Sequence, residues 1–129
     1  MKYLIMMTHS PDEPAQEWTD DDVRASWAHM QQLHQEMSAA GELLASVRLA
    51  GPEATKIVTS DDSGAPVVTD GIFPESKELL AGFWMVEVDG EQRAMEIAAR
   101  TSASPGPGGA PSRKPLVVRP IMDAPAADW

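Results

Sequence analysis

The longest periodic pattern in the sequence is helical. Apolar side chains recur every three or four residues across the segment 23–37, which is the spacing of one face of an amphipathic helix. They are Val23, Trp27, Met30, Leu33 and Met37. Thr19 precedes this run as a candidate N-cap, and Gly41 follows it as a stop signal. The pattern predicts a helix over residues 20–39 whose buried face is centred on Val23.

The remaining hydrophobic runs are short, as expected of strands. The turn sequence Asp61-Asp62-Ser63-Gly64 lies between two of them and predicts a hairpin over residues 54–69. A second helix is predicted over 90–100. The Gly-, Pro- and Ser-rich stretch 101–113 follows it, and we expect a flexible, exposed loop without regular structure there. The other predicted strands cover residues 2–8, 42–50, 82–89 and 116–121, and a Pro/Ala tail covers 123–129.

This order of elements predicts one α+β domain over residues 1–122. It is typical of a ferredoxin-like βαββαβ sandwich with an extra β-hairpin, in which both helices cover one face of the sheet. The first strand is nevertheless apolar on both faces, because Tyr3 and Ile5 point one way while Leu4 and Met6 point the other. An uncovered apolar face predicts a homodimer closed sheet to sheet. The alternative is that the hairpin, the 101–113 loop and the tail cover this face.

Charge and composition narrow the classes of partner and site. The chain has 129 residues, of which 20 are acidic and 10 basic, with a formal charge of −10 and no cysteine. This charge disfavours nucleic acid and anionic membranes as partners, and the lack of cysteine excludes disulfides and thiolate chemistry. We find neither a signal peptide nor an apolar stretch of the ~18 residues that a membrane span needs, so we expect a soluble cytoplasmic protein. His29 and His34 are five residues apart rather than four, and no metal-binding motif is present. We therefore predict no metal site and no cofactor.

Three histidines and one aspartate are candidates for chemistry. His34 lies close to the centre of the predicted buried stripe, so it is either a hydrogen-bonded core histidine or a functional acid/base. His29 lies on the flank of the same helix, as a surface side chain or a functional one. His9 directly follows the first strand, where it is either a solvated loop residue or part of a cleft. Asp70 precedes a glycine, where it either forms a turn or orients an imidazole.

The stretch DGIFPESKELLAGFW at residues 70–84 resembles the signature of the DGPF-motif branch of the YCII-related family. Ile72 replaces the proline of that motif, and the 101–113 loop is longer than is usual in the family. The matching residues are Asp70, Gly71, Phe73, Glu75, Lys77, Glu78, Gly82 and Phe83, and the likeness extends to residues 2–6, 40–44 and 118–120. The resemblance implies a dimeric α/β barrel, with a histidine on the first helix and an aspartate in a cleft as a catalytic pair. His29 is nearer the family's histidine position than His34, and Asp70 matches the motif aspartate.

Two functions follow as hypotheses. The first is a small-molecule site in which His29 or His34 is the general acid/base and Asp70 orients it. The candidate ligand contacts are Arg119, Lys77 and His9, and the alternative role of Arg119 is a strand ion pair. The second is a non-catalytic binding or regulatory module, acting with an alternative sigma factor as the resemblance implies for some relatives. A degenerate relative with neither activity is a third. A histidine beside Asp70 in an open pocket would favour the first hypothesis, and histidines enclosed by core side chains would favour the second.

Overall fold

The computed structural model describes residues 1–14, 16–73 and 75–123. Within these ranges, six strands and two α-helices follow one another in the predicted order, with short 3₁₀ turns at Pro52–Ala54 and Pro107–Gly109. The strands are β1 (Lys2–His9), β2 (Leu43–Arg48), β3 (Lys56–Ser60), β4 (Pro66–Asp70), β5 (Leu79–Glu87) and β6 (Leu116–Pro120). The helices are α1 (Asp20–Ala39) and α2 (Glu91–Ser102). The predicted boundaries differ from these by no more than a few residues.

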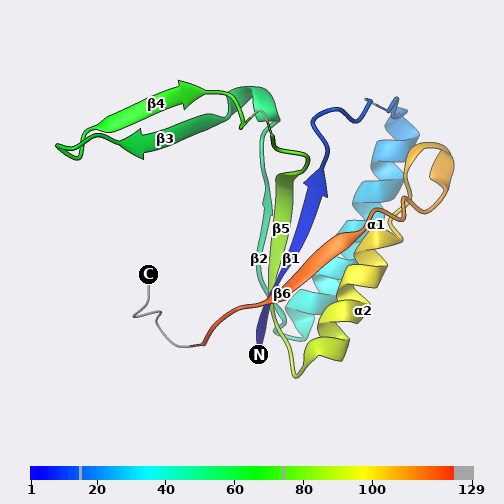
Figure 1. Ribbon diagram of the computed structural model, residues 1–129. Coiled ribbons are helices and arrows are strands. Elements are labelled where there is room, and N and C mark those ends of the chain that lie inside the picture. The colour runs from blue at the N-terminus through cyan, green and yellow to red at the C-terminus, as the bar shows by residue number, and fades with distance from the viewer. Residues whose placement is uncertain (15, 74, 124–129) are drawn as a thin grey trace.

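The strands form two separate sheets. Four of them make an antiparallel sheet in the order β2-β5-β1-β6, while β3 and β4 pair with each other. Both helices lie on the same face of the larger sheet (Figure 1). This arrangement confirms the predicted ferredoxin-like α+β fold, and the β3–β4 hairpin is the extra element between β2 and β5.

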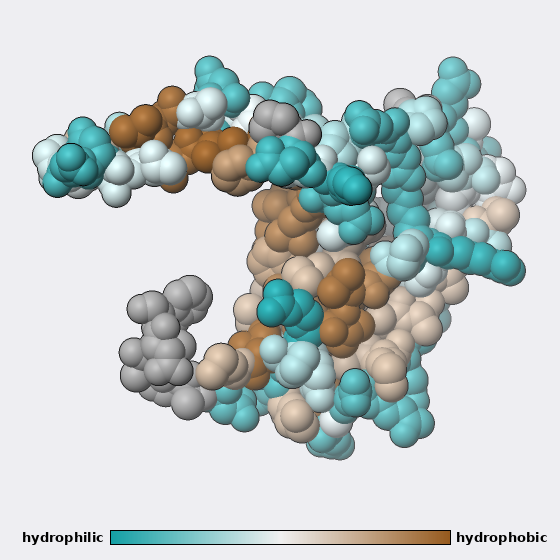
Figure 2. All heavy atoms as spheres, in the orientation of Figure 1, coloured by the Kyte–Doolittle hydropathy of each residue, from teal (hydrophilic) through white to brown (hydrophobic). Residues whose placement is uncertain are grey.

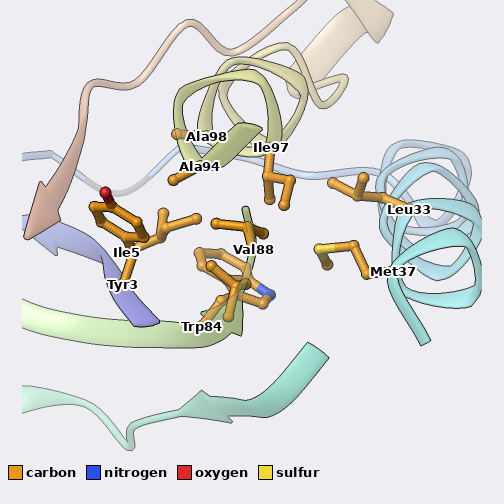
Figure 3. Close-up of a cluster of buried hydrophobic side chains, with 10 residues drawn as sticks. Tyr3, Ile5, Leu33, Met37, Trp84, Val88, Ala94, Ile97 and Ala98 are labelled. Atoms are coloured by element: carbon orange, nitrogen blue, oxygen red, sulfur yellow. The ribbon is translucent and has the colours of Figure 1, made fainter. Parts of the chain in front are cut away.

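The hydrophobic core lies between the larger sheet and the two helices. Successive side chains of a strand point to opposite faces, so alternate residues of β1 and β5 face the helices. Ile5 from β1 and Val86 from β5 are fully buried there. The cluster is completed by Tyr3, Leu33, Met37, Trp84, Val88, Ala94, Ile97 and Ala98 (Figure 3). Apolar burial of this kind is the main force that holds α1 and α2 on the sheet.

Helix α1 begins at the predicted capping residue. Thr19 Oγ1 accepts a hydrogen bond from the backbone N–H of Asp22 at 3.1 Å, and the Asp22 carboxylate accepts one from the Thr19 N–H at 3.0 Å. Two backbone N–H groups at the helix start are thereby satisfied reciprocally. The same bonds hold the pKa of Asp22 below its ordinary value, chiefly through the Thr19 backbone N–H.

The predicted buried face of α1 is wrong in its N-terminal half. Val23 is 53% exposed and Trp27 is 66% exposed, whereas Leu33 and Met37 are fully buried. At about 100° per residue, Val23 and Trp27 lie roughly 80° and 120° around the helix from Leu33. They belong to the flank of the helix, and the sheet covers only the side that carries Leu33 and Met37. Periodicity identifies apolar positions, but it does not identify which of them the sheet covers.

The segment 101–113 contains regular structure, contrary to the prediction. Helix α2 continues to Ser102, and a 3₁₀ turn follows at Pro107–Gly109. The backbone N–H of Gly108 donates to the Asp22 carboxylate of α1 at 3.2 Å. The glycine and proline content indicates where a helix must end, but it does not reveal the hydrogen-bond partners that the segment finds on α1.

The face of the larger sheet opposite α1 and α2 is apolar, and no helix of the described residues covers it. Leu4 lies opposite Met85, and Met6 opposite Phe83, across β1 and β5. We call this surface the open face, and its apolar residues are Leu4, Met6, Val47, Phe83, Met85 and Val117. Figure 2 shows hydrophobic side chains gathered on this side of the molecule, next to the projecting hairpin. The hairpin extends away from the sheet and the 101–113 segment lies beside α1 (Figure 1), so neither covers the open face. The rest of the predicted tail, 124–129, lies outside the described residues.

Candidate functional site

His34 is hydrogen-bonded inside the fold. The indole Nε1–H of Trp84 donates to His34 Nε2 at 2.9 Å, and the two ring centroids are 6.5 Å apart. Nε2 is therefore an acceptor, and the proton of the neutral ring is on Nδ1. Half-burial lowers the pKa of His34 below its ordinary value of 6.5 by desolvation. These contacts agree with the hydrogen-bonded core histidine that the sequence left open as one alternative.

His29 links the two helices. Its Nε2 lies 2.8 Å from the backbone carbonyl oxygen of Arg100 near the end of α2. Because a carbonyl oxygen only accepts, Nε2 carries the proton and donates it. The Arg100 guanidinium reaches back to the Glu36 carboxylate of α1, which lowers the pKa of Glu36. His29 thus belongs to a set of contacts that holds α2 against α1.

Asp70 lies at the base of the hairpin, away from both helix histidines. Its carboxylate forms an exposed ion pair with Lys56 on the neighbouring strand. The next residue, Gly71, adopts a φ of +96°, and its N–H donates to the Thr55 carbonyl oxygen at 2.9 Å. The Asp-Gly pair therefore closes the hairpin. Within one chain, the described contacts do not bring Asp70 together with His29 or His34.

His9 is the histidine that lines a cleft. It is half-buried at the end of β1, where it pairs with Leu79 at the start of β5. The cleft beside it has a volume of about 340 Å³, and we call it the His9 cleft. Its lining residues are Thr8, His9, Ser10, Asp12, Glu13, Glu78, Lys114 and Pro115. The Lys114 ammonium lies 3.6 Å from the Glu13 carboxylate across this cleft.

A second cleft shares His9 with the first and is more apolar. Its volume is about 360 Å³. It is lined by His9, Leu49, Ala50, Gly51, Pro52, Ala54, Thr55, Leu79 and Leu80. The His9 side chain therefore stands between a region rich in ionisable groups and a largely apolar one, as expected for a site that orients a small molecule by its polar end.

A family model described as the YCII-related domain matches residues 1–105, which is most of the 129-residue chain. The chain belongs to the YCII-related family. No curated protein matches it. The match covers the family as a whole, so the DGPF-motif branch stays a prediction that rests on residues 70–84.

In this YCII-family protein, neither of the other two sequence candidates is among the residues that line the two clefts. Lys77 is exposed ahead of β5, and Arg119 is exposed on β6, where it lies opposite Leu4 on the open face. Within the described residues neither side chain forms an ion pair, so the strand ion pair considered for Arg119 is not formed there.

Sequence reasoning missed most of the groups that surround His9. Glu78 is visible in the sequence only as a motif carboxylate, because the predicted strand begins at residue 82 whereas β5 begins at Leu79, which pairs with His9. Lys114 and Asp12 carry no sequence signal, because only the fold brings the start of β6 beside the end of β1.

The described part of the chain holds neither a group of metal-ligating side chains nor a helix that could cross a membrane. Across residues 1–14, 16–73 and 75–123, no three histidine or carboxylate side chains group as a metal site would require. Neither described helix is both long enough and apolar enough to cross a bilayer.

Proposed function

We propose that this YCII-family protein binds a small polar molecule in the His9 cleft, and that it does so as a homodimer. The observation that supports the binding site is the chemistry of one cleft. An imidazole, three carboxylates, an amine and two hydroxyls line a volume of about 340 Å³, which is within the range of small-ligand pockets.

The charges of the cleft indicate the class of ligand. Asp12, Glu13 and Glu78 contribute three negative charges and Lys114 one positive charge, which leaves a net −2 with His9 neutral. Such a site favours ligands that bring hydrogen-bond donors, such as primary amines or molecules with several hydroxyls, and disfavours anions.

His9 is the side chain best placed for acid/base chemistry on such a ligand. Imidazole is the group that exchanges protons near neutral pH, and a ligand in either cleft lies beside the His9 ring. Glu78 lines the same polar cleft and directly precedes the residue that pairs with His9. We therefore assign to Glu78 the orienting role that the sequence suggested for Asp70.

The pairs His29–Asp70 and His34–Asp70 stay hypotheses that require Asp70 to come from a second copy of the chain. In one copy, Nε2 of each of these histidines already has an internal hydrogen-bond partner. This favours the alternative function, binding without catalysis, over acid/base chemistry by these two residues. A regulatory role alongside a sigma factor is implied only by the family resemblance.

The binding site can be tested with the substitution His9→Asn. We expect a thermal-shift screen of small amines, polyols and carboxylic acids to give ligands from the first two classes. Their affinity should fall at least tenfold in His9→Asn and in Glu78→Gln, with the fold intact by circular dichroism. His29→Gln is the matched control and should bind as the wild type does. Ligands that bind equally well to His9→Asn would place the site elsewhere.

The homodimer proposal rests on the open face, because monomers seldom expose contiguous apolar patches beyond a few hundred Å². Light scattering should give twice the chain mass of 13.9 kDa. Met85→Glu places a charge in the centre of this face and should give the single-chain mass. Met95→Glu makes the same change on the exposed side of α2 and should leave the dimer intact. A monomeric wild type, or a Met85→Glu variant that stays dimeric, would contradict the proposal.

A further inference from the structure

The hairpin of β3 and β4 is a second surface that exposes apolar side chains. Val58 lies directly opposite Val68 across the two strands, and their side chains are 59% and 53% exposed. Val67 points to the other face of the hairpin and is 47% exposed. In the described residues each of the two strands pairs only with the other. Both faces of the hairpin therefore present β-branched apolar side chains to water.

A two-stranded hairpin of this kind is marginally stable by itself in water, and it ordinarily needs a third strand or a packing surface. The tip is fixed by Asp61, whose carboxylate accepts hydrogen bonds from the N–H groups of Ser63 and Ala65 at 2.8 and 3.0 Å. The ion pair between Lys56 and Asp70 closes the base. These contacts set the register of the strands, but they bury none of the valines.

We propose that the hairpin is a dimerisation arm, whose Val58 and Val68 side chains pack against a second copy of this chain. This inference rests on the proposed homodimer and identifies the segment that secures it. The hairpin projects to the side of the sheet opposite the helices, which is the side of the open face (Figure 1). In Figure 2 the hairpin and the sheet frame a concave region with hydrophobic side chains at its base. A partner seated on the open face lies within this concavity, and twofold symmetry gives both arms the same contact.

The acidic tip of the arm disfavours polyanionic partners and is complementary to one cation on the open face of a second copy. Asp61 and Asp62 make the tip acidic on a chain of net charge −10, which disfavours nucleic acid and anionic membranes. The open face offers the complementary charge, because Arg119 is exposed there and has no ion-pair partner in the described part of the chain. The arm of one chain thus meets both apolar surface and a cation on the other.

The double substitution Val58→Thr, Val68→Thr tests the arm. Threonine keeps the shape and strand preference of valine but has a hydroxyl in place of one methyl group, which is costly only where the side chain becomes buried. We expect the dimer dissociation constant, measured by sedimentation equilibrium, to rise at least tenfold, with the far-ultraviolet circular dichroism unchanged. Val23→Thr is the matched control, because Val23 is also 53% exposed but lies on α1.

If the dissociation constant of the double variant is unchanged while Met85→Glu is monomeric, the hairpin is not a dimerisation arm, but the proposed dimer through the open face is retained. A wild type that is monomeric at every concentration would overturn both. These outcomes separate the failure of the arm from the failure of the proposed dimer.

Disulfide cross-linking gives a second readout that does not depend on affinity. Because the chain has no cysteine, single-cysteine variants report one position each. A Val68→Cys chain mixed with a differently tagged Val117→Cys chain should form a mixed disulfide under mild oxidation, because Val117 lies on the open face two residues from Arg119. Met95→Cys on α2 replaces the arm cysteine in the control. An arm cysteine that cross-links no more than the control would contradict the proposed contact.

Discussion

Protonation of His34 should destabilise the fold, because the folded chain holds this imidazole neutral. Its Nε2 accepts the Trp84 indole N–H, and burial lowers the pKa of His34 below the ordinary value of 6.5 that applies to the unfolded chain. A protonated ring would turn an N–H toward the indole N–H and lose the bond. The folded state therefore binds this proton less readily than the unfolded state. Its contribution to stability is full above pH 6.5 and is lost as the pH falls below that value.

The size of this effect is that of one half-buried hydrogen bond. Such a bond contributes about 1 kcal/mol to the free energy of unfolding. We therefore expect His34 to account for a loss of at most about 1 kcal/mol as the pH falls from 7 to 5.5. The carboxyl groups of Glu36, Glu42 and Asp61 have pKa values lowered from 4.5 or 3.8 by their hydrogen-bond partners. These carboxyl groups begin to lose their contribution to stability at a lower pH than His34 does. The contribution of His34 can therefore be measured separately from theirs.

Urea unfolding of the wild type and of His34→Gln, followed by fluorescence at several pH values and one fixed protein concentration, measures the effect. Glutamine keeps an acceptor for the Trp84 N–H but does not titrate. The loss of unfolding free energy between pH 7 and pH 5.5 should be smaller in His34→Gln than in the wild type. A His34→Gln variant that loses as much stability as the wild type over this range would refute the assigned role of His34.

Three further substitutions test the core packing, the N-cap of α1 and the Arg93–Glu42 ion pair. Leu33→Ala removes a fully buried side chain from the core and should lower the free energy of unfolding by about 3 kcal/mol in urea titrations. Thr19→Ala breaks the capping box and should cost about 1 kcal/mol in the same assay. Arg93→Met removes the guanidinium that donates two hydrogen bonds to Glu42 at 2.8 and 2.9 Å and holds its pKa below 4.5. Its stability should be about 1 kcal/mol below the wild type at pH 7, and this difference should shrink as the pH falls below 4.5.

The fold could be predicted because its signals are local. The Thr19 cap and the Asp61 turn each act within a few residues, and the order of elements leaves few arrangements of the strands. The covered side of α1 could not be predicted, because Val23 and Leu33 are equally apolar and only the position of the sheet distinguishes them.

The candidate site depended on contacts between distant segments, which no local pattern contains. His34 is paired with Trp84, fifty residues further along the chain. The Trp84 hydrogen bond accounts for the presence of a polar imidazole near the core, and this account does not require a catalytic role. From the sequence, His9 is either a solvated loop residue or part of a cleft. In the structure it lines both clefts, because the end of β1 lies beside the starts of β5 and β6.

In the described part of the chain, the open face, the hairpin and the flank of α1 are apolar surfaces outside the core, and the proposed dimer partner can cover only the first two. The open face and the hairpin lie on the same side of the sheet, whereas the flank of α1 lies on the other (Figure 1). Trp18 precedes the Thr19 N-cap, and Val23 is the fourth residue after it. An apolar pair at these two positions often packs together and fixes the direction in which the chain enters the helix. Trp27 lies one turn further and is 66% exposed.

A dimer formed through the open face leaves Trp27 in water. The part of the fluorescence that is lost in Trp27→Phe comes from Trp27. Its quenching by acrylamide should therefore be the same at protein concentrations below and above the dimer dissociation constant. Protection of Trp27 on association would instead place the partner on the helical side of the molecule, and the open face and the arm would both have to be abandoned as the interface.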